Sequence, residues 1–244
     1  MINTNETTFF ALRERTSFQA CDAALLIWRK NIVSLLLVFV IPITILVAIG
    51  ILVPVLIHLA VFIGVIWWLK PLFERFALHI IQIRFFNTNA KGKALRKNFL
   101  KHTLKGLCGD LLWRRFTPYR SVIMPLRILE NLKGKKLSER KLILTRGGIQ
   151  FGIFLTIFCI SLELLLYASE ALFFTIFNQL VDMSFLYQTN GKISFYIIYI
   201  PYLINYIVME TIYVCAGFSV YINSRIIVEG WDLQLMLNTA AGKK

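Results

Sequence analysis

The sequence predicts an all-α, polytopic membrane protein with four transmembrane helices in two hairpins, joined by amphipathic helices in a basic cytoplasmic segment. A mean hydropathy of +0.67 with 57% hydrophobic residues leaves too little polar surface for a water-facing exterior. Residues 70–146 hold 19 of the 27 lysines and arginines but only four acids, a net of +15. Such residues concentrate on cytoplasmic loops, so the charge indicates topology rather than nucleic-acid binding.

Residues 1–30 are expected to form a cytoplasmic N-terminus that contains one amphipathic helix. Over residues 17–30, with Ser17 as a candidate N-cap, the apolar side chains recur at helical spacing. The predicted stripe consists of Phe18, Cys21, Ala24, Leu25 and Trp28. A helix of this kind usually lies in the membrane interface.

Residues 31–69 predict the first transmembrane hairpin. The first span, residues 31–50, is about 30 Å long, enough for a hydrocarbon core. A Gly-Pro turn signal follows, and the second span, residues 54–69, ends in two tryptophans and then Lys70. This order marks a membrane–water boundary, where we expect Lys70 to extend toward water.

Residues 70–148 predict a basic cytoplasmic segment of amphipathic helices. Residues 71–86 either extend the second span or lie flat on the membrane; flat is favoured, because a straight extension would project about 25 Å of apolar helix. A half-buried helix is expected over residues 91–116. Pro125 is expected to start one short helix and Ser138 to cap another.

Residues 149–223 predict the second hairpin, and residues 224–244 a cytoplasmic tail. The third span covers residues 150–169 and the fourth residues 193–221. Between them, residues 171–181 are apolar enough to extend the third span or to rest at the interface. Four spans with the basic segment inside place both termini in the cytoplasm.

Three stretches resemble a group of uncharacterised four-span inner-membrane proteins of Gram-negative bacteria, and their motifs cover about a fifth of the chain. They are residues 67–75 (Trp-Trp-Leu-Lys-Pro-Leu-Phe-Glu-Arg), residues 112–121 (Leu-Trp-Arg-Arg-Phe-Thr-Pro-Tyr-Arg-Ser) with Pro125-Leu126 and Leu129-Glu130, and residues 210–232 with Gly217-Phe218, Tyr221, Asn223 and Arg225. In that group the tail usually reads Tyr-x-Asn-Arg-Arg and then Leu-Glu-x-Trp-Asp. Here Ser224 replaces the first arginine, and Val228-Glu229-Gly230 stands for Leu-Glu-x.

The resemblance implies a multi-pass protein of the bacterial inner membrane and no enzyme activity. Members of the group tend to be encoded near MoxR-type ATPases and transglutaminase-like membrane proteins. This neighbourhood suggests protein partners within an envelope complex.

Glu163, Glu210 and His58 are the candidate functional residues within the spans. A carboxylate in a span costs about 2.5 kcal/mol or more, so it normally faces protein or water. Glu163 and Glu210 either belong to a proton or cation path or are hydrogen-bonded carboxyls that pack helices together; Tyr206, Tyr213 and His58 are candidate partners. Their depths differ by about 10 to 15 Å, so we expect no direct pair between them. An interhelical hydrogen bond is favoured for His58.

Two polar clusters are candidate binding surfaces on the cytoplasmic side. One comprises Arg114, Arg115, Tyr119, Arg120 and Arg127. It either recognises phosphate or lipid headgroups or simply rests on anionic lipid. The second is formed by the tail residues Arg225, Glu229, Trp231 and Asp232. They either dock on the basic segment or form an amphipathic helix end with Trp231 as anchor, and the resemblance favours docking.

The sequence predicts no catalytic site, no metal site and no cofactor. Its four cysteines are dispersed, and nucleophile-elbow, P-loop and zinc-protease motifs are absent from it. The preferred function is a non-enzymatic scaffold or accessory component of an envelope complex, whose basic face contacts the lipid bilayer and its anionic headgroups. The alternatives are a small transporter or channel with Glu210 on the pathway, and a lipid-binding protein.

Overall fold

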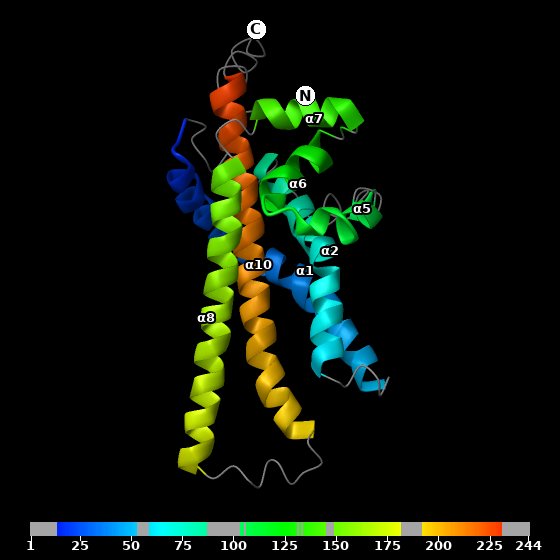
Figure 1. Ribbon diagram of the computed structural model, residues 1–244, viewed down its shortest axis with the longest axis vertical. Helices are drawn as coiled ribbons and strands as arrows, with labels where there is room; N and C mark the ends of the chain where they lie inside the picture. The colour runs from blue at the N-terminus through cyan, green and yellow to red at the C-terminus, as the bar shows by residue number, and fades with distance from the viewer. Residues whose placement is uncertain are drawn as a thin grey trace.

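The computed structural model describes residues 14–52, 59–86, 103–104, 106–130, 132, 134–144, 149–181 and 192–230, and within these ranges it contains helices and no strands. The long helices are α1 (Ser17–Leu52), α2 (Leu59–Phe86), α8 (Ile149–Val181) and α10 (Lys192–Glu229). The short ones are α5 (Leu107–Leu111), the 3-10 helix η3 (Arg114–Phe116), α6 (Arg120–Leu129) and α7 (Gly134–Leu144). Figure 1 shows α10 beside α8, with α2 on the other side of α10, α1 crossing behind them from the side of α8 to that of α2, and the short helices gathered near one end.

Three of the described helices are long and apolar enough to cross a membrane. The candidate spans are Ser17–Ala48 in α1, Gln150–Phe177 in α8 and Ile200–Glu229 in α10. The chain therefore belongs to the all-helical, multi-pass class that its composition predicts. The expected second span, residues 54–69, lies partly outside the described residues, as does His58.

Helix α1 is one element of 36 residues, so the predicted separate interfacial helix over residues 17–30 is wrong. Its cap is Thr16 instead of Ser17. The Gln19 N–H donates to Thr16 Oγ1 at 3.3 Å, and the Thr16 N–H donates to Gln19 Oε1 at 3.2 Å, a capping box. The predicted stripe is also rotated, because Phe18 is exposed while Ala20 packs against α10. Ser219 Oγ donates to the Ala20 carbonyl oxygen at 2.7 Å.

Helix α2 continues through Pro71 to Phe86, so the prediction that residues 71–86 lie flat on the membrane is wrong. The apolar side chains of this half are covered by protein. The Phe73 ring lies 5.8 Å from that of Phe39 on α1, and the Phe85 ring 5.3 Å from that of Phe218 on α10. The helix projects without exposing its apolar face because α1 and α10 bury it.

The basic segment is divided differently from the sequence prediction. The helix expected over residues 91–116 is described only from Thr103 onward, where Gly106 interrupts it with a φ of 74°. Helix α6 begins before Pro125 and contains it, and α7 contains Ser138 instead of starting there. Most of α6 is buried, and this packing outweighs the backbone donor that the proline lacks.

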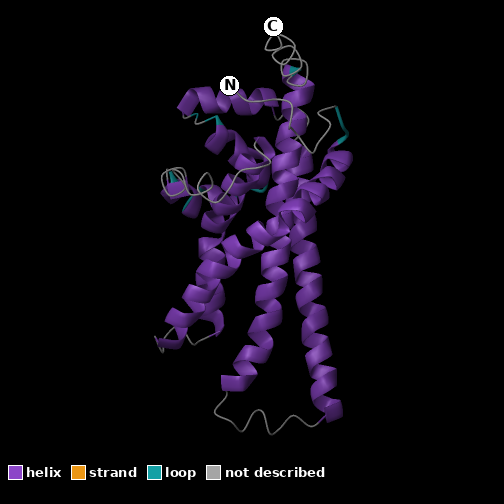
Figure 2. Ribbon diagram, turned by 180° about the vertical axis from the view of Figure 1, so that it is seen from behind, coloured by secondary structure: helices purple, strands orange, loops and turns teal. Residues whose placement is uncertain are grey.

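Helix α10 forms the centre of the structure. It contacts α1, α2, α6, α7 and α8, and Figure 2 shows the same arrangement from behind. Gly217 permits the close contact between α10 and α6, because a Cβ at this position would lie 2.5 Å from the Ser121 carbonyl oxygen of α6. Helix α8 runs unbroken to Val181, so residues 171–181 continue the same helix, and the candidate span within it reaches Phe177.

Candidate functional site

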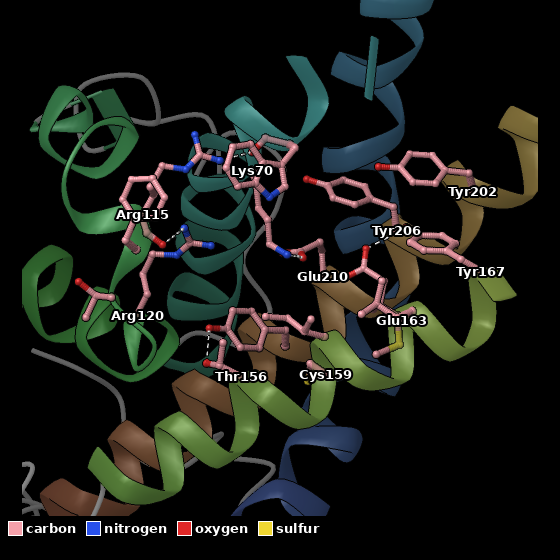
Figure 3. A pocket seen from close by; sticks show the side chains of 17 residues that line it. Lys70, Arg115, Arg120, Thr156, Cys159, Glu163, Tyr167, Tyr202, Tyr206 and Glu210 are labelled. Atoms are coloured by element: carbon pink, nitrogen blue, oxygen red, sulfur yellow. Dashed lines mark hydrogen bonds and ion pairs between the residues drawn. The ribbon is translucent and has the colours of Figure 1, made fainter. Parts of the chain in front are cut away.

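A cavity of about 490 Å³ lies between α2, α8, α10 and the segment from η3 to α6. Its volume is in the range of small-molecule binding sites. Charged and phenolic side chains line it (Figure 3): Lys70, Arg115, Arg120, Glu163, Glu210, Tyr167, Tyr202, Tyr206 and Tyr213. These residues come from four separate parts of the chain.

Lys70 and Glu210 form an ion pair in the cavity wall. Lys70 is 18% exposed and Glu210 only 2%. Lys70 Nζ also lies 6.0 Å from the ring centroids of Tyr206 and Tyr213. Burial lowers the pKa of Lys70, but the carboxylates, Glu210 foremost, outweigh it and raise that pKa above the ordinary lysine value. The lysine is therefore a fixed cation.

This pair corrects two expectations. Lys70 points into the protein and does not extend to water. Among the described residues, the partner of Glu210 is this lysine and not Tyr206 or Tyr213, which the sequence suggested; His58 lies outside the described residues. The other carboxylate oxygen, Glu210 Oε2, is buried and has no hydrogen-bond partner among the described residues, and the same holds for the Tyr206 hydroxyl.

Arg120 and Arg115 supply the cationic side of the cavity. Arg120 is buried and ion-paired with Glu74 of α2. Burial lowers the pKa of Arg120, and the charge of Glu74 more than offsets this and raises it. Arg115 stacks over Trp67, with 3.5 Å between its Cζ and the ring centroid, and its Nη2 donates to the Trp67 carbonyl oxygen at 2.9 Å. Burial and then the charge of Arg120 lower the pKa of Arg115, which stays charged at neutral pH.

Both arginines keep a donor that is not used by the described residues. These donors are Arg115 Nη1 and Arg120 Nε, and both atoms are buried. Buried polar groups normally have partners, because an unmade hydrogen bond costs about 1 to 3 kcal/mol. These atoms have almost no accessible surface, so they lie behind the cavity wall, and the charged side chains that line the cavity define its chemistry.

Glu163 lies across the cavity from the arginines, on α8 (Figure 3). It accepts a hydrogen bond from the Tyr167 hydroxyl at 2.9 Å. Tyr167 stacks on Tyr202 with ring centroids 4.9 Å apart, and Tyr202 stacks in turn on Tyr206 at 6.4 Å. Glu163 and Glu210 do not pair with each other, as their different depths predict, but both line the same cavity.

The lining of the cavity also includes exposed apolar side chains. Trp67 is 48% exposed, Phe116 73% and Leu164 62%. They come from α2, η3 and α8, three of the elements that enclose the cavity. The site thus combines a charged interior with an apolar rim.

The remaining arginines of the predicted cluster serve other contacts. Arg127 pairs with the buried Asp110, and Arg75 Nε donates to the same carboxylate at 2.9 Å. Arg114 is half exposed, and its Nη1 lies 3.7 Å from Asp110. The Tyr119 hydroxyl accepts a hydrogen bond from Lys141 Nζ at 2.8 Å. Only Arg115 and Arg120 of the five predicted residues reach the cavity.

The tail residues that the structure describes contact the basic segment. Glu229 pairs with Arg140 of α7, and Arg225 lies 3.9 Å from Glu130. Arg140 Nε donates to Glu130 at 2.8 Å, and the Tyr221 hydroxyl donates to Glu130 at 2.9 Å. We call these five side chains the tail network. Trp231 and Asp232 lie outside the described residues.

Sequence reasoning missed Lys70, Glu74, Asp110 and Glu130 as organising residues. A usable signal was present: the basic segment has only four acids among 19 cations. A carboxylate so heavily outnumbered is expected to attract several cations at once. Of the four acids in the segment, Glu74, Asp110 and Glu130 each attract several cations or form a buried ion pair.

Within the described ranges, no three metal-ligating side chains of His, Cys, Asp or Glu lie close enough together to hold a metal ion. No family model, curated protein or solved structure matches this chain. The geometry of the cavity is therefore the basis for a functional conclusion.

Proposed function

We propose that this protein is a membrane protein that binds the polar headgroup of a membrane amphiphile in the cavity between α2, α8 and α10. The supporting observation is the contrast between the two parts of the cavity wall. Its interior holds Lys70, Glu163 and Glu210, whereas its rim exposes apolar side chains, among them Leu164 on α8, a helix apolar enough to cross a membrane. An amphiphile matches this contrast when its headgroup lies inside and its chains leave across the rim.

The charge distribution supports a cytoplasmic location for the cavity mouth. Arg115 and Arg120 belong to the basic segment, which the positive-inside rule assigns to the cytoplasm. The cavity then begins near the end of the second span, and its α8 side reaches into the third span as far as Tyr167. In this arrangement, both termini are cytoplasmic, and the resemblance to four-span proteins makes a bacterial inner membrane the proposed location.

This proposal selects the lipid-binding alternative over the scaffold role preferred from the sequence. The scaffold role and a partner in an envelope complex stay predictions, because both involve surfaces on which the described residues show no bound partner. The transport alternative needs Glu210 to exchange protons or cations. Its ion pair with Lys70 argues for a fixed charge at this position instead.

The experiment measures phospholipid that remains bound after gentle solubilisation and purification. Cys159→Trp should fill the cavity, because Cys159 lines it and is half buried. The matched control is Ile157→Trp, two positions away on α8 with an exposed side chain outside the cavity lining. We expect the cavity variant to lose most of its bound lipid, measured by mass spectrometry of the extract.

The control variant should retain the wild-type amount of lipid. Equal lipid retention in both variants, with both folded by circular dichroism, would contradict the proposal. Bound lipid would then belong to the general membrane-facing surface and not to the cavity.

A further inference from the structure

The charges of the cavity wall are separated into a cationic and an anionic end. Three of the five are neutralised locally, since Lys70 pairs with Glu210, and Arg120 pairs with Glu74, which does not line the cavity. Two others, Arg115 and Glu163, form no ion pair with any described residue. The uncompensated charges of the cavity are therefore one guanidinium and one carboxylate.

These two charges lie on opposite sides of the cavity. Figure 3 shows Arg115 and Arg120 together at one side, Glu163 at the other, and the Lys70–Glu210 pair between them. A complementary ligand has an anion at the end near Arg115 and a cation at the end near Glu163.

We propose that the ligand is a zwitterion with a phosphate ester held by Arg115 and Arg120 and a primary ammonium held by Glu163. This assignment rests on the proposed headgroup-binding function and identifies its ligand class. Guanidinium groups are suited to phosphate because their rigid fork of donors matches its oxygens. An ammonium group supplies both a compensating charge and hydrogen-bond donors to the Glu163 carboxylate, which the Tyr167 hydroxyl orients.

The arrangement of the tyrosines distinguishes a primary from a quaternary ammonium. Quaternary ammonium groups are held by cages of open aromatic faces. Here the rings of Tyr167, Tyr202 and Tyr206 lie nearly parallel in a row, with interplanar angles of 23° and 14°, and do not form a cage around one point. The Tyr167 hydroxyl also orients the Glu163 carboxylate by a hydrogen bond. Binding at this end thus depends on hydrogen-bond donation, which a trimethylammonium cannot provide.

The test presents purified, full-length protein with an equimolar mixture of dioleoyl phosphatidylethanolamine, phosphatidylcholine and phosphatidylglycerol, and counts bound lipids by native mass spectrometry. We expect the ethanolamine lipid to bind at least about ten-fold more tightly than the other two, as one good charged contact implies. Glu163→Gln should reduce its binding to the level of the choline lipid. Arg115→Gln should weaken all three lipids alike, because all three contain the phosphate.

Two matched variants control for general effects of charge. Glu170→Gln neutralises a half-buried carboxylate on the same helix outside the cavity lining, and Arg114→Gln removes the arginine adjacent to Arg115. Both should retain the lipid preference of the wild type. Tyr167→Phe, which removes only the hydroxyl that orients Glu163, gives a second reading if Glu163→Gln does not fold. It should reduce the ethanolamine preference about three-fold or more.

The possible outcomes separate this inference from the proposed function. Equal binding of ethanolamine and choline lipids, or a preference for phosphatidylglycerol, would overturn the ligand assignment and leave headgroup binding intact. Failure of every lipid to bind would overturn the proposed function.

Glycerophosphoethanolamine, which lacks acyl chains, should bind much more weakly than the lipid. Equal binding would support the zwitterion but contradict a membrane source.

Discussion

Lys70 of α2 and Glu210 of α10 form an ion pair inside the cavity wall, and this pair joins two helices that lie far apart in the sequence. Both side chains are largely removed from solvent, with exposures of 18% and 2%. The desolvation cost of such a pair offsets much of its Coulomb attraction. Removing one member is therefore far more harmful than removing both.

The first prediction concerns this ion pair. Glu210→Gln leaves the Lys70 ammonium without its main partner and should lower the free energy of unfolding by about 3 kcal/mol. The double variant Lys70→Met, Glu210→Leu should lower it by less than about 1.5 kcal/mol, because no buried charge is left unpaired. Unfolding in mixed detergent micelles, followed by circular dichroism, measures both. A loss for the double variant as large as that for Glu210→Gln would contradict this account.

The second prediction concerns the approach of α10 to α6. A Cβ at Gly217 would lie 2.5 Å from both Cβ and the carbonyl oxygen of Ser121, and the backbone there cannot move independently. Gly217→Ala should therefore destabilise the protein by about 1 to 3 kcal/mol. Gly64 of α2 is the matched control, since its Cβ would have no atom within 4 Å. Gly64→Ala should be neutral or stabilising by up to about 1 kcal/mol. Similar thermal denaturation shifts for the two variants would refute this.

The third prediction concerns the tail network of Tyr221, Arg225, Glu229, Glu130 and Arg140. Hydrogen bonding to Glu130 is the main cause that raises the pKa of Arg140, while burial opposes it. Because the pKa of Arg140 is higher in the folded protein than in the unfolded one, the stabilisation that this cation provides is complete at any pH below the unfolded-state pKa. It is lost only when the pH exceeds the folded-state pKa. Changing from about pH 6 to about pH 9 should therefore leave the contribution of Arg140 unchanged.

Salt concentration should weaken the ion pairs of the tail network, although pH in this range should not. The charged members of the tail network are only partly buried, so an increase from about 0.05 M to about 1 M salt should screen them. We expect hydrogen exchange of the α7 amides to accelerate several-fold in high salt and in Glu130→Gln. The exposed Glu139→Gln is the control and should exchange as the wild type does. An α7 exchange rate insensitive to both changes would show that the ion pairs do not hold this helix.

The fourth prediction tests the orientation. Cys108 on α5 is exposed, whereas Cys215 on α10 is buried. A membrane-impermeant maleimide should label Cys108 in inside-out vesicles and not in intact spheroplasts, because the positive-inside rule places the basic segment in the cytoplasm. Cys108→Ser should abolish most of the labelling. Labelling of Cys108 from outside would require the opposite topology.

The sequence predicted the broad class of this protein, because long apolar stretches and a cluster of basic residues can be recognised from the composition and the order of residues alone. It also indicated that Glu163 and Glu210 need partners, since an isolated carboxylate in a span is costly. Local signals were less reliable at helix boundaries. Pro125 was expected to start a helix but lies within α6, whose buried residues stabilise it despite the missing donor.

The partners themselves depended on tertiary structure. The snorkelling expected for Lys70 and the flat helix expected for residues 71–86 both followed from treating α2 alone. In the fold, α10 provides Glu210 for Lys70 and, with α1, covers the apolar side chains of α2. Periodicity says which side chains share a face but not which helix covers that face.

The sequence by itself determined that this chain forms long apolar helices around a basic segment, because hydropathy and charge act residue by residue. Only the tertiary structure decided that Arg115 and Glu163 face one cavity from opposite sides, and that Lys70, Arg120 and Arg127 are paired. The physical reason is that pairing depends on distances between residues far apart in the chain. Those distances are set by how the helices pack around α10.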